Sequence, residues 1–164
     1  RFYVSGPDAS VAMELDGRGI VVKAIGDKIG QASGIKMCYA ALTKGTHTLH
    51  VALLTAAAKM GLTDDLKKEF EFSQKEHLIA METGISRLPA NAHRWIGEME
   101  EISSTFESLG ITPNFHNGAA DVYRMLVRTT FSEETPETID KNRTTWETIE
   151  ALVDLTNPEN NSEI

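Results

Sequence analysis

Hydrophobic residues near the start of this chain form short continuous runs, whereas later they recur at helical spacing. Phe2-Tyr3-Val4-Ser5 and Ile20-Val21-Val22-Lys23-Ala24-Ile25 are β-branched or aromatic runs typical of strands. Between them, Asp8 can cap a short helix that carries Val11 and Leu15. The pattern predicts a β-α-β unit. Since two strands do not form a stable sheet alone, we expect it to be the trailing edge of a larger α/β sheet.

No proline occurs from Gln31 to Met60, and apolar residues recur there at helical spacing. This pattern predicts one long helix that ends at Gly61. Gly34 and Gly45 lie inside it and each costs about 1 kcal/mol relative to alanine, so we expect them to allow close approach of another helix. The predicted core stripe of this helix consists of Ile35, Tyr39, Leu42, Thr46, Leu49, Leu53 and Met60.

Four further helices follow from the same spacing and from proline and glycine at their ends. We place them from Thr63 to Gly84, from Pro89 to Leu109, from about Asn117 to Phe131, and from Thr135 past Val153. The fold class is therefore mainly α, an antiparallel multi-helix domain preceded by a β-α-β remnant. We expect the remnant in residues 1–27, the helical domain in 28–156 and a disordered polar tail in 157–164.

Composition narrows the possible partners. The 164 residues carry a formal net charge of −8 and no dense Lys/Arg cluster, which argues against binding to nucleic acid or to an anionic membrane surface. No apolar run approaches the roughly 20 residues that span a bilayer. The single cysteine, Cys38, cannot form an internal disulfide. We expect a soluble, cytoplasmic protein.

The stretch from Gly26 to Tyr39 is a glycine-spaced loop that runs into the long helix, with Lys36 near the helix start. The positive end of the helix dipole disfavours the charged form of a lysine at this place. Behind a loop whose glycines let a ligand approach the backbone, such a lysine could exchange protons near neutral pH. The alternative is a surface lysine whose stem extends along the helix.

These residues resemble the junction between the Rossmann domain and the helical domain of β-hydroxyacid dehydrogenases, which include hydroxyisobutyrate and phosphogluconate dehydrogenases. The pattern of that family is G-x-x-G-x-G-x-x-x-K-x-x-x-N. Gly30 and Lys36 match it, whereas Asp27 and Ala32 replace glycines and Ala40 replaces the asparagine.

A subgroup of phosphogluconate-dehydrogenase-like proteins is more similar still. The likeness covers roughly residues 2–128. It includes the stretches from Gly30 to Ala40, from Thr43 to Gly45 and from Arg94 to Glu101, together with Ser5-Gly6-Pro7. The resemblance implies the fold of the C-terminal helical domain of this family, which commonly forms the dimer. We therefore expect a homodimer and, in the longer protein, a small hydroxy acid as substrate.

The resemblance implies that Lys36 is the general acid/base of an oxidoreductase that uses NAD or NADP. It places Gly30 and Ala32 beside the cofactor. The positions that would contact the substrate are Tyr39, Ala40 and Glu98. No G-x-G-x-x-G occurs in the chain, so the pyrophosphate-binding turn is absent from it. We expect this piece alone to be inactive.

Other polar residues have simpler interpretations. His47 and His50 share a helix face with Lys36 but lack a nearby carboxylate on that helix, so we expect a solvated face or a helix contact and no metal. Glu98 and Glu101 favour a solvated face or salt bridges to Arg94. The alternative function for the whole chain is a non-catalytic helical dimerisation module.

Overall fold

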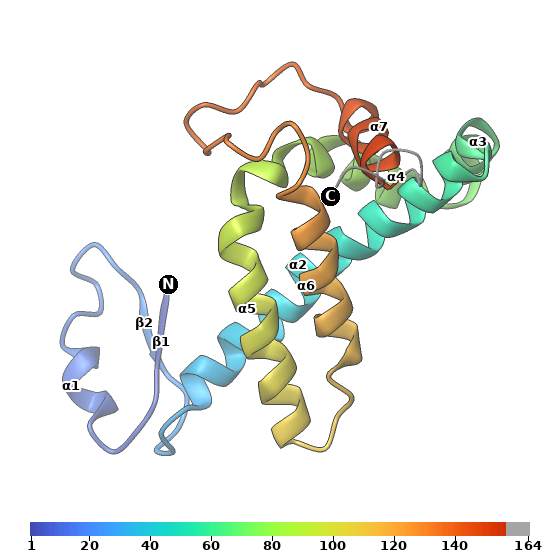
Figure 1. Ribbon diagram of the computed structural model, residues 1–164. Helices are drawn as coiled ribbons and strands as arrows, with labels where there is room; N and C mark the ends of the chain where they lie inside the picture. Colours follow the sequence, from blue (N-terminus) through green and yellow to red (C-terminus); the bar gives the residue numbers. More distant parts are fainter. Residues whose placement is uncertain (157–164) are drawn as a thin grey trace. The chain divides into compact units, whose positions relative to one another are not determined.

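The computed structural model of the protein describes residues 1–156 (Figure 1). Their contacts form two compact units, one of Arg1–Leu42 and one that begins at Thr43. The long helix α2, Gln31–Lys59, starts in the first unit and continues in the second. The domain boundary predicted after residue 27 refers to a longer protein and stays a prediction, and the predicted tail 157–164 lies outside the described residues.

The first unit contains the predicted β-α-β arrangement. Strands β1 (Phe2–Val4) and β2 (Val22–Ala24) pair in parallel, with Tyr3 opposite Lys23, and helix α1 (Ala9–Met13) connects them. The β-branched and aromatic runs therefore form strands as expected. Asp8 is the N-cap residue of α1, as predicted, although its side chain makes no capping hydrogen bond.

Helix α2 is one continuous helix, as the absence of proline predicts. Gly61 follows it with a φ of 71°, and the Leu62 amide donates to the Ala57 carbonyl at 2.9 Å. Glycine adopts this left-handed conformation without strain. The hydrogen bond from the Leu62 amide satisfies the Ala57 carbonyl, which has no partner within the helix. The predicted C-terminus is confirmed.

The buried face of α2 differs from the predicted stripe. Tyr39 is 70% exposed, Leu42 69%, Leu49 63% and Met60 64%, so these large side chains are not in the core. The buried positions of α2 are Ala40, Thr48, His50, Val51, Leu54, Thr55 and Ala57. Near this face, a Cβ at Gly45 would be in ordinary van der Waals contact with the His116 ring, at 4.0 Å.

The remaining helices all lie in the second unit. They are α3 (Thr63–Ser73), α4 (Lys75–Gly84), the 3₁₀ turn η1 (Ile85–Arg87), α5 (Pro89–Ser108), α6 (Asn114–Leu126) and α7 (Thr145–Leu155). Helices α5 and α6 run side by side in opposite directions (Figure 1). The mainly helical fold class is confirmed, with a small two-stranded parallel sheet.

One predicted helix is two helices in the structure. The backbone leaves the helical region at Gln74, which has φ −139° and ψ 41°. Just before it, the Ser73 hydroxyl donates to the Glu69 carbonyl at 2.9 Å, a local bond of the kind that bends or ends helices. His77, in the second of these two helices, is exposed.

The last helix begins at Thr145 rather than at Thr135. Thr144 and Glu147 form a capping box, in which the Glu147 amide donates to the Thr144 hydroxyl at 3.2 Å and the Thr144 amide donates to the Glu147 carboxylate at 2.7 Å. Around Thr135 the threonine side chains bond locally instead, since the Thr135 amide donates to the Thr138 hydroxyl at 2.8 Å. Residues 127–144 are therefore turns and loop.

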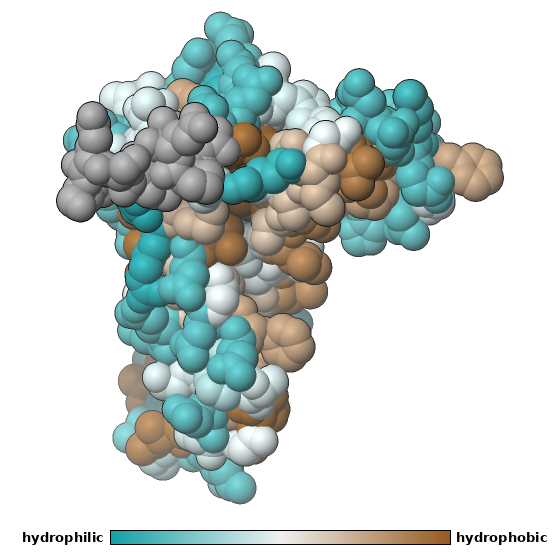
Figure 2. Space-filling view, turned by 45° about the vertical axis from the view of Figure 1, so that its right-hand side comes forward, coloured by the Kyte–Doolittle hydropathy of each residue, from teal (hydrophilic) through white to brown (hydrophobic). Residues whose placement is uncertain are grey.

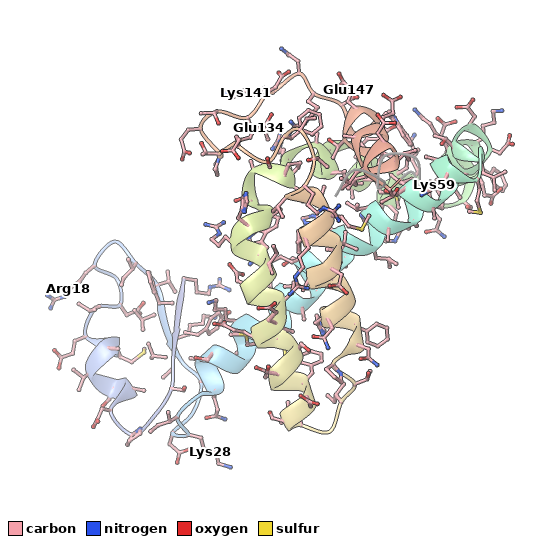
Figure 3. All side chains as sticks on the ribbon, viewed as in Figure 1. Arg18, Lys28, Lys59, Glu134, Lys141 and Glu147 are labelled. Atoms are coloured by element: carbon pink, nitrogen blue, oxygen red, sulfur yellow. The ribbon has the colours of Figure 1, made fainter. Side chains whose placement is uncertain are left out.

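A buried arginine attaches this loop to the helices. The Arg143 side chain is 3% exposed; its guanidinium pairs with Glu134, donates to the Ser86 carbonyl, and lies 4.0 Å from the centre of the Phe131 ring. Figure 3 shows Glu134 in the loop and Glu147 at the start of α7. The core beneath contains the fully buried Ile102, Tyr123, Leu126, Ile149 and Leu152.

Within residues 1–156, none of the helices combines the length and apolar character needed to cross a membrane.

Candidate functional site

Hydrogen bonds with the two residues that follow β1 hold the start of α2 and the loop before it in the first unit. The Ala32 amide donates to the Ser5 hydroxyl at 3.0 Å, which satisfies one of the donors that the first turn of a helix leaves open. The Gly6 amide donates to the Gly26 carbonyl at 3.1 Å. The glycine-spaced loop before α2 is thus anchored to the end of the strand. The Ala32 amide, predicted to lie beside a cofactor, is already used by Ser5.

Gly30 has the backbone conformation that glycine makes possible. Its φ is 94°, and among the described residues no atom beyond its chain neighbours comes within 4 Å of the place where a Cβ would stand. The Gly30 carbonyl accepts from the Gly34 amide at 2.8 Å, at the entry to the helix. Space in front of this turn is therefore open to a ligand.

A groove of about 760 Å³ lies between β1 and the first turns of α2, entirely within the first unit. Its main side chains are Phe2, Tyr3, Ser33, Ile35, Lys36 and Tyr39. Arg1 and Ala32 complete the lining, so the groove carries two cationic side chains and no carboxylate. Such a lining favours an anion that also has an apolar part.

Lys36 is exposed in this groove, at the place where the motif predicts a proton-transfer group. Within residues 1–156, no ion pair or hydrogen bond holds its amine. Ser33 precedes it by three residues and Tyr39 follows it by three, so all three share one helix face. The Lys36 amine is thus available to a bound molecule.

Tyr39 and Ala40 differ in their surroundings. Tyr39 lines the groove and is 70% exposed, which corrects its assignment to the core stripe. Ala40 is buried at 7% exposure and is not among the groove residues, although the asparagine of the family pattern falls on this position. Of the two predicted substrate positions on α2, only Tyr39 reaches the groove.

Glu98 lies in the second unit and pairs with a lysine of α2. The Glu98 carboxylate accepts a hydrogen bond from the Lys44 ammonium, which lies 5.4 Å from the centre of the Trp95 ring. The same carboxylate lies 3.9 Å from the Arg94 guanidinium. The salt bridge predicted between Glu98 and Arg94 is present, but Lys44 is the closer partner. The role of Glu98 as a substrate contact stays a prediction.

Lys44 is a residue that sequence reasoning missed as a partner for Glu98. Its own carbonyl accepts a hydrogen bond from the Tyr123 hydroxyl at 3.0 Å. Tyr123 is fully buried, and burial raises the pKa of its hydroxyl, so the group stays a donor. The available signal was the spacing of Lys36, Ala40 and Lys44, which places Lys44 two helical turns after Lys36 on the same face.

The two histidines of α2 form helix contacts, one of the two alternatives predicted. His47 stacks near Trp95 with ring centres 6.5 Å apart, and the His50 ring lies 6.1 Å from that of His77. Burial lowers the pKa of both, and for His50 the neighbouring His47 and His77 lower it further. Among the described residues, no three His, Cys, Asp or Glu side chains are grouped so as to hold a metal ion.

Comparison with known proteins supports the class of fold. Residues 57–126 match the family described as "Domain of unknown function (DUF1932)", which is the C-terminal domain of 3-hydroxyacid dehydrogenase-like proteins. The conserved protein MTH1747 of unknown function has a solved structure described as similar to 3-hydroxyacid dehydrogenases. Our chain is 30% identical to it with a TM-score of 0.61, over 76% of this chain and 48% of that one.

Two more proteins are similar. A conserved hypothetical protein from Sinorhizobium meliloti 1021 shares the fold, with a TM-score of 0.74 and 23% identity over 93% of this chain and 51% of that one. An uncharacterized 28.5 kDa protein of Methanothermus fervidus is 29% identical over 79 residues, which are 48% of this chain and 32% of that protein. The resemblance predicted from the sequence is confirmed, and the chain spans between 32% and 51% of the length of these proteins.

Proposed function

We propose that this chain is the C-terminal, substrate-binding and dimerisation part of an NAD(P)-dependent oxidoreductase that acts on a small hydroxy acid. The observation that supports it most is the position of Lys36, exposed in a groove that has cations but no carboxylate, one and a half turns after the open Gly30 turn. The similarity to 3-hydroxyacid dehydrogenase-like proteins supports the same class of reaction.

The residues fit a nicotinamide at the Gly30 turn. A side chain at Gly30 would occupy the open space in front of the turn, and its φ of 94° disfavours any other residue. Nicotinamide, when bound, supplies the acceptor for the hydride that leaves the carbinol carbon. Most of the contacts to NAD or NADP would come from a Rossmann domain preceding these residues, since no G-x-G-x-x-G occurs here.

Lys36 would move the proton. In its neutral form the amine accepts the proton of the substrate hydroxyl while the carbinol C–H electrons leave as hydride, which yields the carbonyl compound and an ammonium. In the reverse direction the ammonium donates that proton. Ser33 and Tyr39, on the same helix face, can hold the substrate against the amine.

The test uses the longer protein that carries this chain behind its nicotinamide-binding domain. Lys36→Ala should reduce turnover by about 10²–10⁴-fold, the usual contribution of a general acid/base, while the Kd for the nicotinamide cofactor stays within about twofold. Lys28→Ala, a lysine of the loop before α2 that lies outside the groove lining, is the matched control (Figure 3). Unchanged turnover in Lys36→Ala would overturn the assigned role.

A dimer forms the second part of the proposal. Large apolar side chains of the second unit are exposed on α2, directly after it, and on α3 and α4: Leu49 at 63%, Met60 at 64%, Phe72 at 89% and Ile79 at 51%. On the face drawn in Figure 2, apolar side chains gather at the surface next to hydrophilic ones. Contiguous exposed apolar surface marks interaction sites, and we propose that these residues contribute to one whose occupant is a second copy of the chain.

The same exposed residues favour the alternative function, a non-catalytic dimerisation module. In that case Lys36 is a surface lysine and the helices serve only to associate. The turnover assay of the longer protein distinguishes the two, because a module would oxidise no hydroxy acid and its association would be unaffected by Lys36→Ala.

A further inference from the structure

We propose that the groove beside Lys36 selects a carboxylate that carries a bulky, aromatic or branched apolar group, with Tyr39 as the residue that determines this selectivity. The inference rests on the proposed function for its catalytic consequence and on the groove itself for binding. It assigns a substrate class where the family resemblance gives only a hydroxy acid.

The charge of the groove requires an anion. Its ionisable lining consists of Arg1 and Lys36, both cationic, together with the phenols of Tyr3 and Tyr39. The other lining residues are apolar apart from Ser33. A neutral or cationic ligand would leave the Lys36 charge without compensation, whereas a carboxylate compensates it at short range.

The apolar part of the lining is large for a small hydroxy acid. Aromatic rings of Phe2, Tyr3 and Tyr39 and the side chain of Ile35 line about 760 Å³ of space. A propanoate skeleton would leave most of these rings in contact with water. A phenyl or branched alkyl group would bury them, and apolar burial contributes about 25 cal/mol per Å².

The groove presents the ring of Tyr39 where the family pattern predicts an asparagine amide beside the lysine. The asparagine position is Ala40, which is buried and outside the groove, so no amide is available there to bind a polar substrate group. One residue earlier, Tyr39 follows Lys36 by three positions and presents its ring to the groove. Hydrogen bonding is thus replaced by an aromatic wall next to the proton-transfer group.

Binding to this chain tests the inference directly. The probes are 3-phenylpropanoate, propanoate and the neutral 3-phenylpropan-1-ol, titrated by NMR. We expect 3-phenylpropanoate to bind at least about tenfold more tightly than either other probe, the range that apolar pocket contacts give. Tyr39→Ala should remove most of the preference over propanoate, and Tyr39→Phe should keep it.

Two controls make the result specific. Phe115 on α6 is 77% exposed and lies outside the groove. Phe115→Ala removes this ring and should leave the Kd values of all three probes unchanged. Lys36→Met should lower the affinity for 3-phenylpropanoate to that of 3-phenylpropan-1-ol. Equal affinities for the three probes, or an unchanged preference in Tyr39→Ala, would overturn the inference.

Turnover by the longer protein separates this inference from the proposed function. Selective binding of 3-phenylpropanoate without oxidation of any hydroxy acid would refute the dehydrogenase and leave the binding site standing. Lys36-dependent oxidation of 3-hydroxybutyrate and 3-hydroxy-3-phenylpropanoate at equal kcat/KM, unaffected by Tyr39→Ala, would refute the selectivity and leave the dehydrogenase standing.

Discussion

Arg143 allows a quantitative test of how the loop between α6 and α7 is held. Its guanidinium is 3% exposed and has three kinds of partner: the Glu134 carboxylate, the Ser86 carbonyl at 3.2 Å from Nε, and the Phe131 ring at 4.0 Å. Arg143→Met keeps the length of the stem but leaves the Glu134 carboxylate, 19% exposed, without its cation. Breaking a buried pair in this way costs about 3–5 kcal/mol of unfolding free energy.

A substitution of Glu134, the other member of the pair, shows how much of that loss of unfolding free energy is electrostatic. Glu134→Gln in the Arg143→Met background removes the uncompensated charge, so the double variant should be more stable than Arg143→Met alone by about 1–3 kcal/mol. Chemical denaturation at pH 7.5, followed by circular dichroism, gives each free energy of unfolding. A strictly additive double variant would refute direct coupling between the two side chains.

An exposed pair provides the matched control. Lys68 and Asp65 lie 3.6 Å apart with side chains 74% and 78% exposed. Lys68→Met should change the free energy of unfolding by less than about 0.5 kcal/mol, as for other exposed pairs. If Lys68→Met and Arg143→Met destabilise the chain equally, the buried position of Arg143 is not what makes its contacts strong, and the reasoning fails.

Three more predictions concern the second unit. Burial lowers the pKa of His47 and His50 from 6.5, so their contribution to the unfolding free energy should be constant above pH 6.5 and fall as the pH drops below it. A flat profile of unfolding free energy between pH 7.5 and 5 would contradict this. Leu49→Lys together with Met60→Lys should convert a dimer into folded monomers in light scattering, and a persistent dimer would place the interface elsewhere. Thr144→Ala should cost about 1 kcal/mol by removing the cap of α7, whereas no loss would contradict the capping-box assignment.

Strands and helix ends were predictable where local chemistry determines them. The parallel strands follow from β-branched runs, and the ends of α2 and α5 follow from Gly61 and Gly110, which adopt φ of 71° and 73°. The start of α7 carried an equally local signal, Thr144-x-x-Glu147, which outweighs Thr135-Pro136-Glu137 because both halves of its capping box form.

The buried face of α2 was not predictable from hydrophobicity. Its large apolar residues point outward, while Thr48, His50 and Thr55 are buried at 4%, 5% and 7% exposure. Tertiary packing decides this, because a helix with apolar residues around much of its circumference can bury either face. If a second copy of the chain binds here, it would cover Leu49 and explain why α2 carries large apolar residues on its exposed face.

The site was predictable as a set of neighbours on one helix but not as a groove. The motif located Gly30 and Lys36, and i, i+3 spacing brings Tyr39 beside the lysine. The contribution of the aromatic side chains of Phe2 and Tyr3 on β1, and of Ser5 just after it, depends on how the chain folds back. No spacing rule links these positions to Lys36.

The most direct test of the central claim is chemical rescue of Lys36→Ala in the longer protein. If the Lys36 amine transfers the hydroxyl proton, added ethylamine should restore hydroxy-acid oxidation in proportion to the concentration of its free base, with cofactor affinity unchanged. Wild-type turnover by Lys36→Ala without any added amine would contradict a proton-transfer role for this lysine.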